Sequence, residues 1–367
     1  MAILSRISQP LVVYSSRRGS ARSYPHRPSI PWRTALIIDT HAHVVPGSLI
    51  ETLRTEQRMF PSVRLLAEAG TIRMAFAGQP PTRPIAPRLR DLAQRREWLT
   101  SARIDHQVVG GWTDVYGYEL PGAEGADWAR FFNEHLINDA AALTALTPLA
   151  TVPLQAGALA ASVLDEALDK GFKGVMIGTQ PKGVGGNLDD PELDPFWELA
   201  SARHATIFLH PMYICGDERL SEYDLLNAVG RLTDTTIAMA RLFFSGHLTR
   251  FPGATLVVSH GGGALPYALG RLRRNHAIHA EYPDPLDGFR QLYFDTVLFE
   301  ARALRFLCDV AGADKVVLGS DYPFPIGDPD PLRVVDETSL TRVERRAILG
   351  ETAARIFHID CGCGGDR

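Results

Sequence analysis

The chain has 367 residues, of which 45% are hydrophobic and 22% are charged, and its formal net charge is −4. These values are ordinary for a globular protein and exclude the fibrous and the disordered classes. No apolar run reaches the roughly 20 residues that a membrane-spanning helix needs, so we expect a soluble protein. Residues 36 onward are acidic and carry no basic stripe interleaved with aromatic residues, which argues against nucleic acid as a partner.

The two ends of the chain differ from the rest in composition. Residues 1–35 contain six arginines and no acidic residue. A transit peptide has this composition, but a start codon assigned too far upstream explains it as well, and we favour the second interpretation. We predict a poorly ordered extension at residues 1–35 and a flexible tail at residues 359–367. The cysteines lack the spacing of a disulfide framework, so we expect reduced thiols and a cytoplasmic protein. They are Cys215, Cys308, Cys361 and Cys363.

From residue 36 onward, short β-type runs alternate with helical patterns, which is typical of βα units and a parallel sheet. The helical patterns have apolar residues every three to four positions and end at glycines. Eight strands with intervening helices predict an α/β fold of the (β/α)8 TIM-barrel type over residues 36–358. The predicted strands span residues 35–39, 107–112, 146–154, 174–179, 205–211, 254–260, 291–296 and 315–321.

The segment after the first predicted strand, residues 44–104, is too long for a simple crossover. It contains "TIRMAFAG" at residues 71–78, which favours a hairpin strand, and a charged helical pattern at residues 87–105. We predict a small insertion that folds over one end of the barrel, where such insertions commonly shape a pocket.

Ligand-type side chains stand where several predicted strands end. His41 and His43 follow the first strand, His210 the fifth, His260 the sixth and Asp321 the eighth. The carboxyl ends of barrel strands open onto one face, so these five residues are expected to converge there. A single histidine in such a place is more often structural, but the joint pattern favours a metal site. Three imidazoles and a carboxylate suit zinc or another divalent cation and leave a position for water or substrate.

Several motifs of the chain resemble those of the amidohydrolase superfamily. Within it they resemble most the branch that contains aminocarboxymuconate-semialdehyde decarboxylase and the resorcylate and carboxyvanillate decarboxylases. The motifs are "DTHAHVVP", "FLHPM", "FPGATLVVSHGGGALPYALGRL", "FDTVLF" and "VVLGSDYPFPIGD". The resemblance covers residues 36–358, and it implies His260 as the catalytic base and Asp321 as a further proton carrier. The metal ligands that it implies are His41, His43, His210 and Asp321.

The same resemblance extends to the residues that contact the substrate. Arg83 in "PTRPI" resembles an arginine that binds a substrate carboxylate, although a solvated surface charge explains it equally well. Arg271, eleven residues after His260, resembles a second substrate arginine that the family donates across a dimer interface, which implies a homodimer or a higher homo-oligomer. We expect Phe324 to contact the substrate too. Met212 and Tyr213 differ from the aromatic residue and the acid of the muconate-semialdehyde enzymes, which leaves the substrate open.

The predicted function is metal-dependent, non-oxidative decarboxylation in the breakdown of aromatic compounds, by a carbon–carbon lyase. The substrate is expected to be a small carboxylated unsaturated or aromatic acid, similar to 2-amino-3-carboxymuconate-6-semialdehyde or to an ortho-hydroxybenzoate. We expect one divalent ion, zinc with manganese as the alternative, since the fourth strand "GVMIGT" lacks the lysine or glutamate of binuclear relatives. The alternatives are a metal-dependent hydrolase or hydratase on the same scaffold and a non-catalytic metal-binding protein.

Overall fold

The computed structural model describes residues 36–56, 59–68, 70–182, 186–212 and 217–360. The arginine-rich start, Tyr213, the three cysteines other than Cys308 and the last residues of the expected tail lie outside this part, and the domain bounds stay a prediction. All described residues belong to one compact unit. None of the helices in this part of the chain combines the length and apolar character required to cross a bilayer.

Each of the eight predicted strand regions overlaps an observed strand. These strands are β1 (Ile38–Val44), β4 (His106–Gly111), β5 (Leu146–Pro148), β6 (Gly174–Gly178), β7 (Thr206–His210), β8 (Thr255–Val258), β9 (Tyr293–Asp295) and β10 (Val316–Val317). The helices after β4 are α4 (Gly122–Ala141), α5 (Gly157–Asp169), α6 (Asp194–Ala202), α7 (Arg231–Phe244), α8 (His247–Arg250), α9 (Leu265–Ile278), α10 (Pro285–Phe289), α11 (Ala301–Ala311), α12 (Pro331–Glu337), α13 (Arg342–Arg346) and α14 (Thr352–Ile356).

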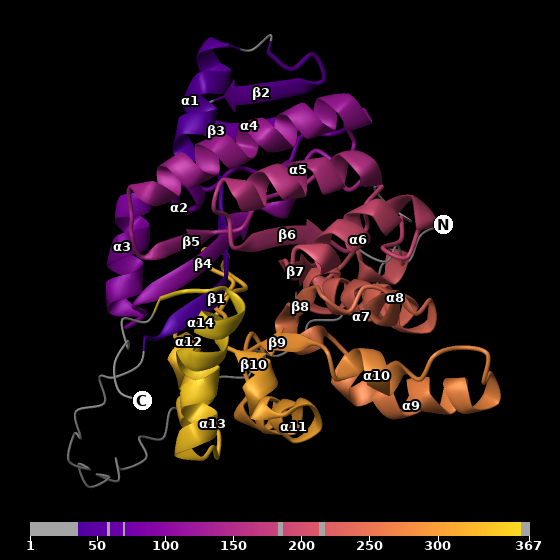
Figure 1. Cartoon of the computed structure of the whole chain (residues 1–367). Helices are drawn as coiled ribbons and strands as arrows, with labels where there is room; N and C mark the ends of the chain where they lie inside the picture. Colours follow the sequence, from indigo (N-terminus) through magenta and orange to yellow (C-terminus); the bar gives the residue numbers. More distant parts are fainter. Residues whose placement is uncertain (1–35, 57–58, 69, 183–185, 213–216, 361–367) are drawn as a thin grey trace, which may run out of the picture. The chain divides into compact units, whose positions relative to one another are not determined.

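The eight strands form two parallel sheets that join at both sides. One sheet has the order β1, β4, β5 and the other the order β10, β9, β8, β7, β6, which Figure 1 shows with the helices lying outside the strands. A parallel bridge between Ala150 and Val175 links the segment after β5 to β6. A second one, between Ala42 and Tyr322, links β1 to the segment after β10. The predicted (β/α)8 barrel is therefore confirmed.

The strands are buried on both faces, as parallel strands covered by helices are. Every residue of β6 and of β7 is buried, which explains why "GVMIG" and "TIFLH" are nearly continuous apolar runs. Some strand bounds differ from the predicted ones. β1 continues through His41 and His43, because Ala42 and Val44 still pair with β4. β5 is shorter than predicted and ends at Pro148, which has no N–H to donate to a ladder.

The insertion after β1 carries the predicted hairpin. It begins with α1 (Gly47–Thr55) and continues as the antiparallel pair β2 (Val63–Glu68) and β3 (Thr71–Phe76). The prediction of a single charged helix at residues 87–105 was wrong. Two helices, α2 (Pro87–Arg90) and α3 (Leu92–Ser101), occupy that stretch. Asp91 separates them, because its extended backbone lets its carboxylate accept the N–H groups of Ala93 and Gln94 and start a new helix.

Candidate metal centre and active site

Four side chains predicted as ligands converge at the mouth of the barrel. His41 and His43 come from β1, His210 ends β7 and Asp321 follows β10, and one ligand atom from each lies within 4.8 Å of the others. Nε2 of His41 lies 3.2 Å from Nε2 of His43. Oδ1 of Asp321 lies 3.4 Å from Nε2 of His41 and 3.1 Å from Nε2 of His43. Ligands about 2 Å from a tetrahedral zinc ion are about 3.3 Å apart, so these separations fit one ion.

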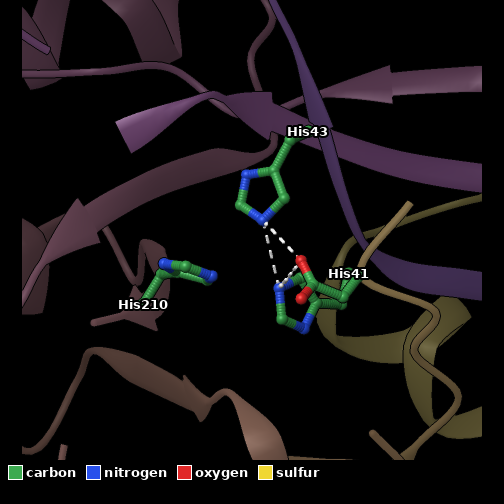
Figure 2. A group of neighbouring side chains, drawn as sticks. His41, His43 and His210 are labelled. Carbon is green, nitrogen blue, oxygen red and sulfur yellow. Dashed lines mark hydrogen bonds and ion pairs between the residues drawn. The ribbon is translucent and has the colours of Figure 1, made fainter. Parts of the chain in front are cut away.

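The rings of the three histidines point toward one another in Figure 2, and Nε2 of His41 and Nε2 of His43 face each other. In each of them Nδ1 contacts an oxygen on the far side of the ring, and this contact fixes a tautomer with Nε2 free for a metal. The oxygen partners are Oδ2 of Asp295 for His41 (2.6 Å), the carbonyl oxygen of Pro211 for His210 (2.8 Å) and the carbonyl oxygen of Gly111 for His43 (3.4 Å). Nε2 of His210 is buried and has no hydrogen-bond partner among the described residues.

The pKa shifts of His43, His210 and Asp321 suit a cation, and that of His41 runs the other way. Burial lowers the pKa of His43, and burial with the neighbouring histidines holds the pKa of His210 well below its usual value, so both rings are neutral. Burial works to raise the pKa of Asp321, but His41 and the other imidazoles outweigh it and hold that pKa well below the usual range. Burial works to lower the pKa of His41, but the carboxylates of Asp321 and Asp295 outweigh it and raise the pKa. Neutral imidazoles and an ionised carboxylate are the forms that bind metal, so a proton on His41 would be displaced when a cation binds.

Asp295, which the sequence analysis missed, connects the metal ligands to the turn that carries His260. It is fully buried at the end of β9, and while Oδ2 contacts His41, Oδ1 accepts the N–H groups of Gly261 (2.9 Å) and Val297 (3.1 Å). Its position at a strand end within the motif "FDTVLF" was the available signal. One carboxylate thus orients a ligand and fixes the backbone beside His260.

His260 lies beside the four ligands with its Nε2 3.7 Å from Oδ2 of Asp321. His260 and Asp321 have positive φ angles of 54° and 59°, which are uncommon for residues other than glycine and cluster at functional sites. Gly261 follows with a φ of 60°, and a Cβ there would come within 2.4 Å of Leu298. The glycines of "HGGG" therefore allow a tight turn that presents the imidazole at the barrel mouth.

A buried polar network supports β1 next to its histidines, and the sequence analysis missed it as well. Arg95, from α3, is fully buried and donates to the carbonyl oxygen of His43 (2.5 Å) and to Oε1 of Gln107 (2.6 Å). Gln107 and Ser320 both donate to Oδ2 of Asp39, at 2.7 and 2.6 Å. Burial raises the pKa of Asp39 to about 6 and lowers that of Arg95 to about 10. Polar residues inside apolar strand runs were the signal for this network.

Two adjoining cavities open over the metal centre. The metal-side cavity, of about 390 Å³, is lined by residues that include His210, His260, Asp321 and Phe324. The outer cavity, of about 410 Å³, includes Met212 and side chains of the insertion. Both volumes are in the range of small-molecule sites. Four residues line both cavities: Arg83, Asp224, Asn227 and Arg231.

The structure brings two of the three predicted substrate-binding residues to these cavities. Arg83 lines both, but its Nε and Nη2 donate to the two carboxylate oxygens of Asp114 at 3.0 Å each, and its guanidinium lies over the ring of Trp112. Phe324 lines the metal-side cavity, and its ring centroid lies 5.1 Å from that of His43.

The third residue, Arg271, is exposed on α9 and lines neither cavity of its own chain. Arg231 at the start of α7 lines both, although the sequence analysis did not select it. It was missed because nothing in the sequence distinguishes it from the many surface arginines.

Comparison with known proteins finds decarboxylases that are similar to this chain. The 2-amino-3-carboxymuconate-6-semialdehyde decarboxylase of Dictyostelium discoideum is 29% identical over 282 residues, which cover 72% of this chain and 76% of the relative. The solved structure of the 5-carboxyvanillate decarboxylase of Sphingomonas paucimobilis is similar with a TM-score of 0.74 and 22% identity, over 89% of this chain and 100% of that chain. A dihydroxybenzoic acid decarboxylase of Polaromonas, solved with bound manganese, is similar with a TM-score of 0.72 and 19% identity, over 89% and 98%.

These two structural likenesses show the shared fold. The family model described as "Amidohydrolase" matches residues 38–359, which is nearly the whole of the described barrel. The chain belongs to the amidohydrolase family.

Proposed function

We propose that this chain is a metal-dependent, non-oxidative decarboxylase of a small carboxylated unsaturated or aromatic acid. The observation that carries the proposal is the donor set at the barrel mouth, in which one ring nitrogen from each of three histidines and a carboxylate oxygen lie within 4.8 Å of one another. His260 and a cavity of about 390 Å³ lie directly beside that set. The decarboxylase relatives, similar along most of the chain, support the same reaction class.

The metal ligands and His260 have different roles in this reaction. A divalent cation held by His41, His43, His210 and Asp321 would supply a Lewis acid that polarises a substrate oxygen. When the bond to the carboxylate carbon breaks, carbon dioxide leaves and the bonding electrons stay on the substrate carbon. A keto, imine or ortho-hydroxy group of the substrate delocalises them, and His260 delivers the proton that completes the product.

We propose zinc as the ion, because imidazole nitrogens and carboxylate oxygens are its usual protein ligands besides thiolates. Manganese is the alternative, and it is supported by the manganese in the Polaromonas decarboxylase.

We also propose a homodimer or higher homo-oligomer in which Arg271 reaches the cavity of the partner subunit. Support comes from its exposure on α9, outside the cavities of its own chain. A cytoplasmic location is proposed on the free, buried thiol of Cys308, which fits a reducing compartment.

The test combines metal analysis with a screen for carbon dioxide release over hydroxybenzoates and carboxymuconate semialdehydes. The proposal predicts stoichiometric metal and release of one carbon dioxide per substrate consumed, abolished by chelation and restored by metal. Consumption of water without loss of carbon would instead establish the hydrolase or hydratase alternative.

A further inference from the structure

Arg231 is a cation fixed between the metal centre and the outer cavity. Its Nη1 donates to the carbonyl oxygen of Pro211 at 3.1 Å, and the same oxygen contacts Nδ1 of His210 at 2.8 Å. The side chain is partly buried and lines both cavities. The guanidinium is therefore held next to a metal ligand, facing the space that a substrate fills.

This guanidinium is not paired with a carboxylate at contact distance among the described residues. Within the described part of the chain it forms no ion pair within 4.0 Å, and the only carboxylate side chain outside that part is Asp366. Arg83, by contrast, is matched by the bidentate contact with Asp114. Burial lowers the pKa of Arg231, and the positive charge of Arg83, which lines the same two cavities, lowers it further.

Burial and Arg83 outweigh the carboxylates of Asp114, Asp321 and Asp234, which work to raise the pKa of Arg231, so its charge is compensated only in part. Asp224 lines both cavities, but it is exposed, so water screens its carboxylate. A partly buried cation without a partner is costly, and an anion that enters the cavity removes that cost with charge-assisted hydrogen bonds. Arg231 presents its remaining N–H groups for such contacts.

We propose that Arg231 binds a second carboxylate of the substrate, so that the enzyme acts on dicarboxylic acids in preference to monocarboxylic ones. The inference rests on the proposed function and narrows its substrate class. One carboxylate lies at the metal and His260, where it is lost as carbon dioxide. The second lies against Arg231, toward the outer cavity, and is retained in the product.

The test measures binding instead of turnover. Benzoate, benzene-1,3-dicarboxylate and benzene-1,4-dicarboxylate lack the hydroxyl group that a decarboxylation needs, so they serve as inert probes for calorimetric titration of the metal-loaded full-length protein. We expect the better diacid to bind about 10-fold or more tightly than benzoate, as a charged hydrogen-bonded pair allows. Arg231→Gln keeps an N–H donor for Pro211 but removes the charge, and it should bring the two affinities within about 2-fold without weakening benzoate.

Two further variants complete the experiment. Arg231→Lys retains the charge and should keep part of the preference. Arg241→Gln, on the same helix but paired with Asp189 outside both cavities, should keep all of it. Metal content should stay the same in every variant, because a purely supporting role toward His210 predicts metal loss instead.

The outcomes separate the two proposals. An unchanged preference in Arg231→Gln, or equal binding of mono- and diacids by the wild-type protein, would overturn the subsite and leave the decarboxylase standing. Metal loss together with weaker benzoate binding in Arg231→Gln would overturn it too, in favour of a supporting role. If the wild-type protein binds none of the acids and decarboxylates none in the screen, the proposed function fails and the subsite fails with it.

Discussion

Replacing Asp295 by asparagine tests whether the carboxylate behind His41 prepares the metal site. The change keeps the shape, and the asparagine oxygen takes the place of Oδ1, which accepts two backbone N–H groups. The amide NH₂ then faces Nδ1 of His41, where Oδ2 lies 2.6 Å away in the native protein. Because NH₂ is a donor, His41 must shift its proton to Nε2, the atom that faces the metal.

We expect Asp295→Asn to weaken metal binding by about 10- to 100-fold, which is the usual effect of removing a hydrogen-bond partner of a metal-bound histidine. This corresponds to about 1.4–2.7 kcal/mol of binding free energy. The assay is a competition titration of metal-free protein against a chelator of known affinity, with circular dichroism to verify the fold. Asp309→Asn, an exposed change on α11, is the control and should bind metal like the wild type. An Asp295→Asn protein with native metal affinity would refute this account of the site.

Three further predictions concern catalysis, the core and the buried thiol. His260→Gln should retain stoichiometric metal, because His260 is outside the four-ligand group, while carbon dioxide release falls by about 100-fold or more; metal loss would make it a ligand. Arg95→Ala should lower the free energy of unfolding by about 3 kcal/mol in urea titrations, because it leaves buried polar groups without partners; a change below about 1 kcal/mol would contradict the network. Burial raises the pKa of Cys308 to about 11, so at pH 8 only about one thiol in a thousand is ionised. Peptide mass spectrometry should therefore find Cys308 unalkylated by iodoacetamide in the folded protein and alkylated after unfolding. Equal labelling of the two states would contradict its burial.

The barrel could be predicted from the sequence because parallel strands buried on both faces are apolar along their whole length. The candidate ligands could be predicted for the same reason, since His41, His43 and His210 are polar residues at the ends of such runs. The exact bounds of the strands and helices were harder to predict from the sequence. The division of the helix at Asp91 depends on one carboxylate that caps two backbone N–H groups, and this contact leaves the helical periodicity of the sequence intact.

The residues that support the site could not be found in the same way. Asp295, Gln107 and Arg95 act through partners far away along the chain, 254 residues for the contact of Asp295 with His41 and 52 for that of Arg95 with the carbonyl oxygen of His43. A periodicity carries no information about such pairs. Arg231 stands out because it forms no ion pair among the described residues, and only the three-dimensional structure shows this.

The most direct test of the account is an equilibrium metal titration of metal-free protein with zinc and with manganese, followed by metal analysis after dialysis. The account predicts one tightly held ion per chain, and its loss when His210 is replaced by alanine. A wild-type protein that holds no stoichiometric ion, or a His210→Ala protein that holds the ion as tightly as the wild type, would contradict it.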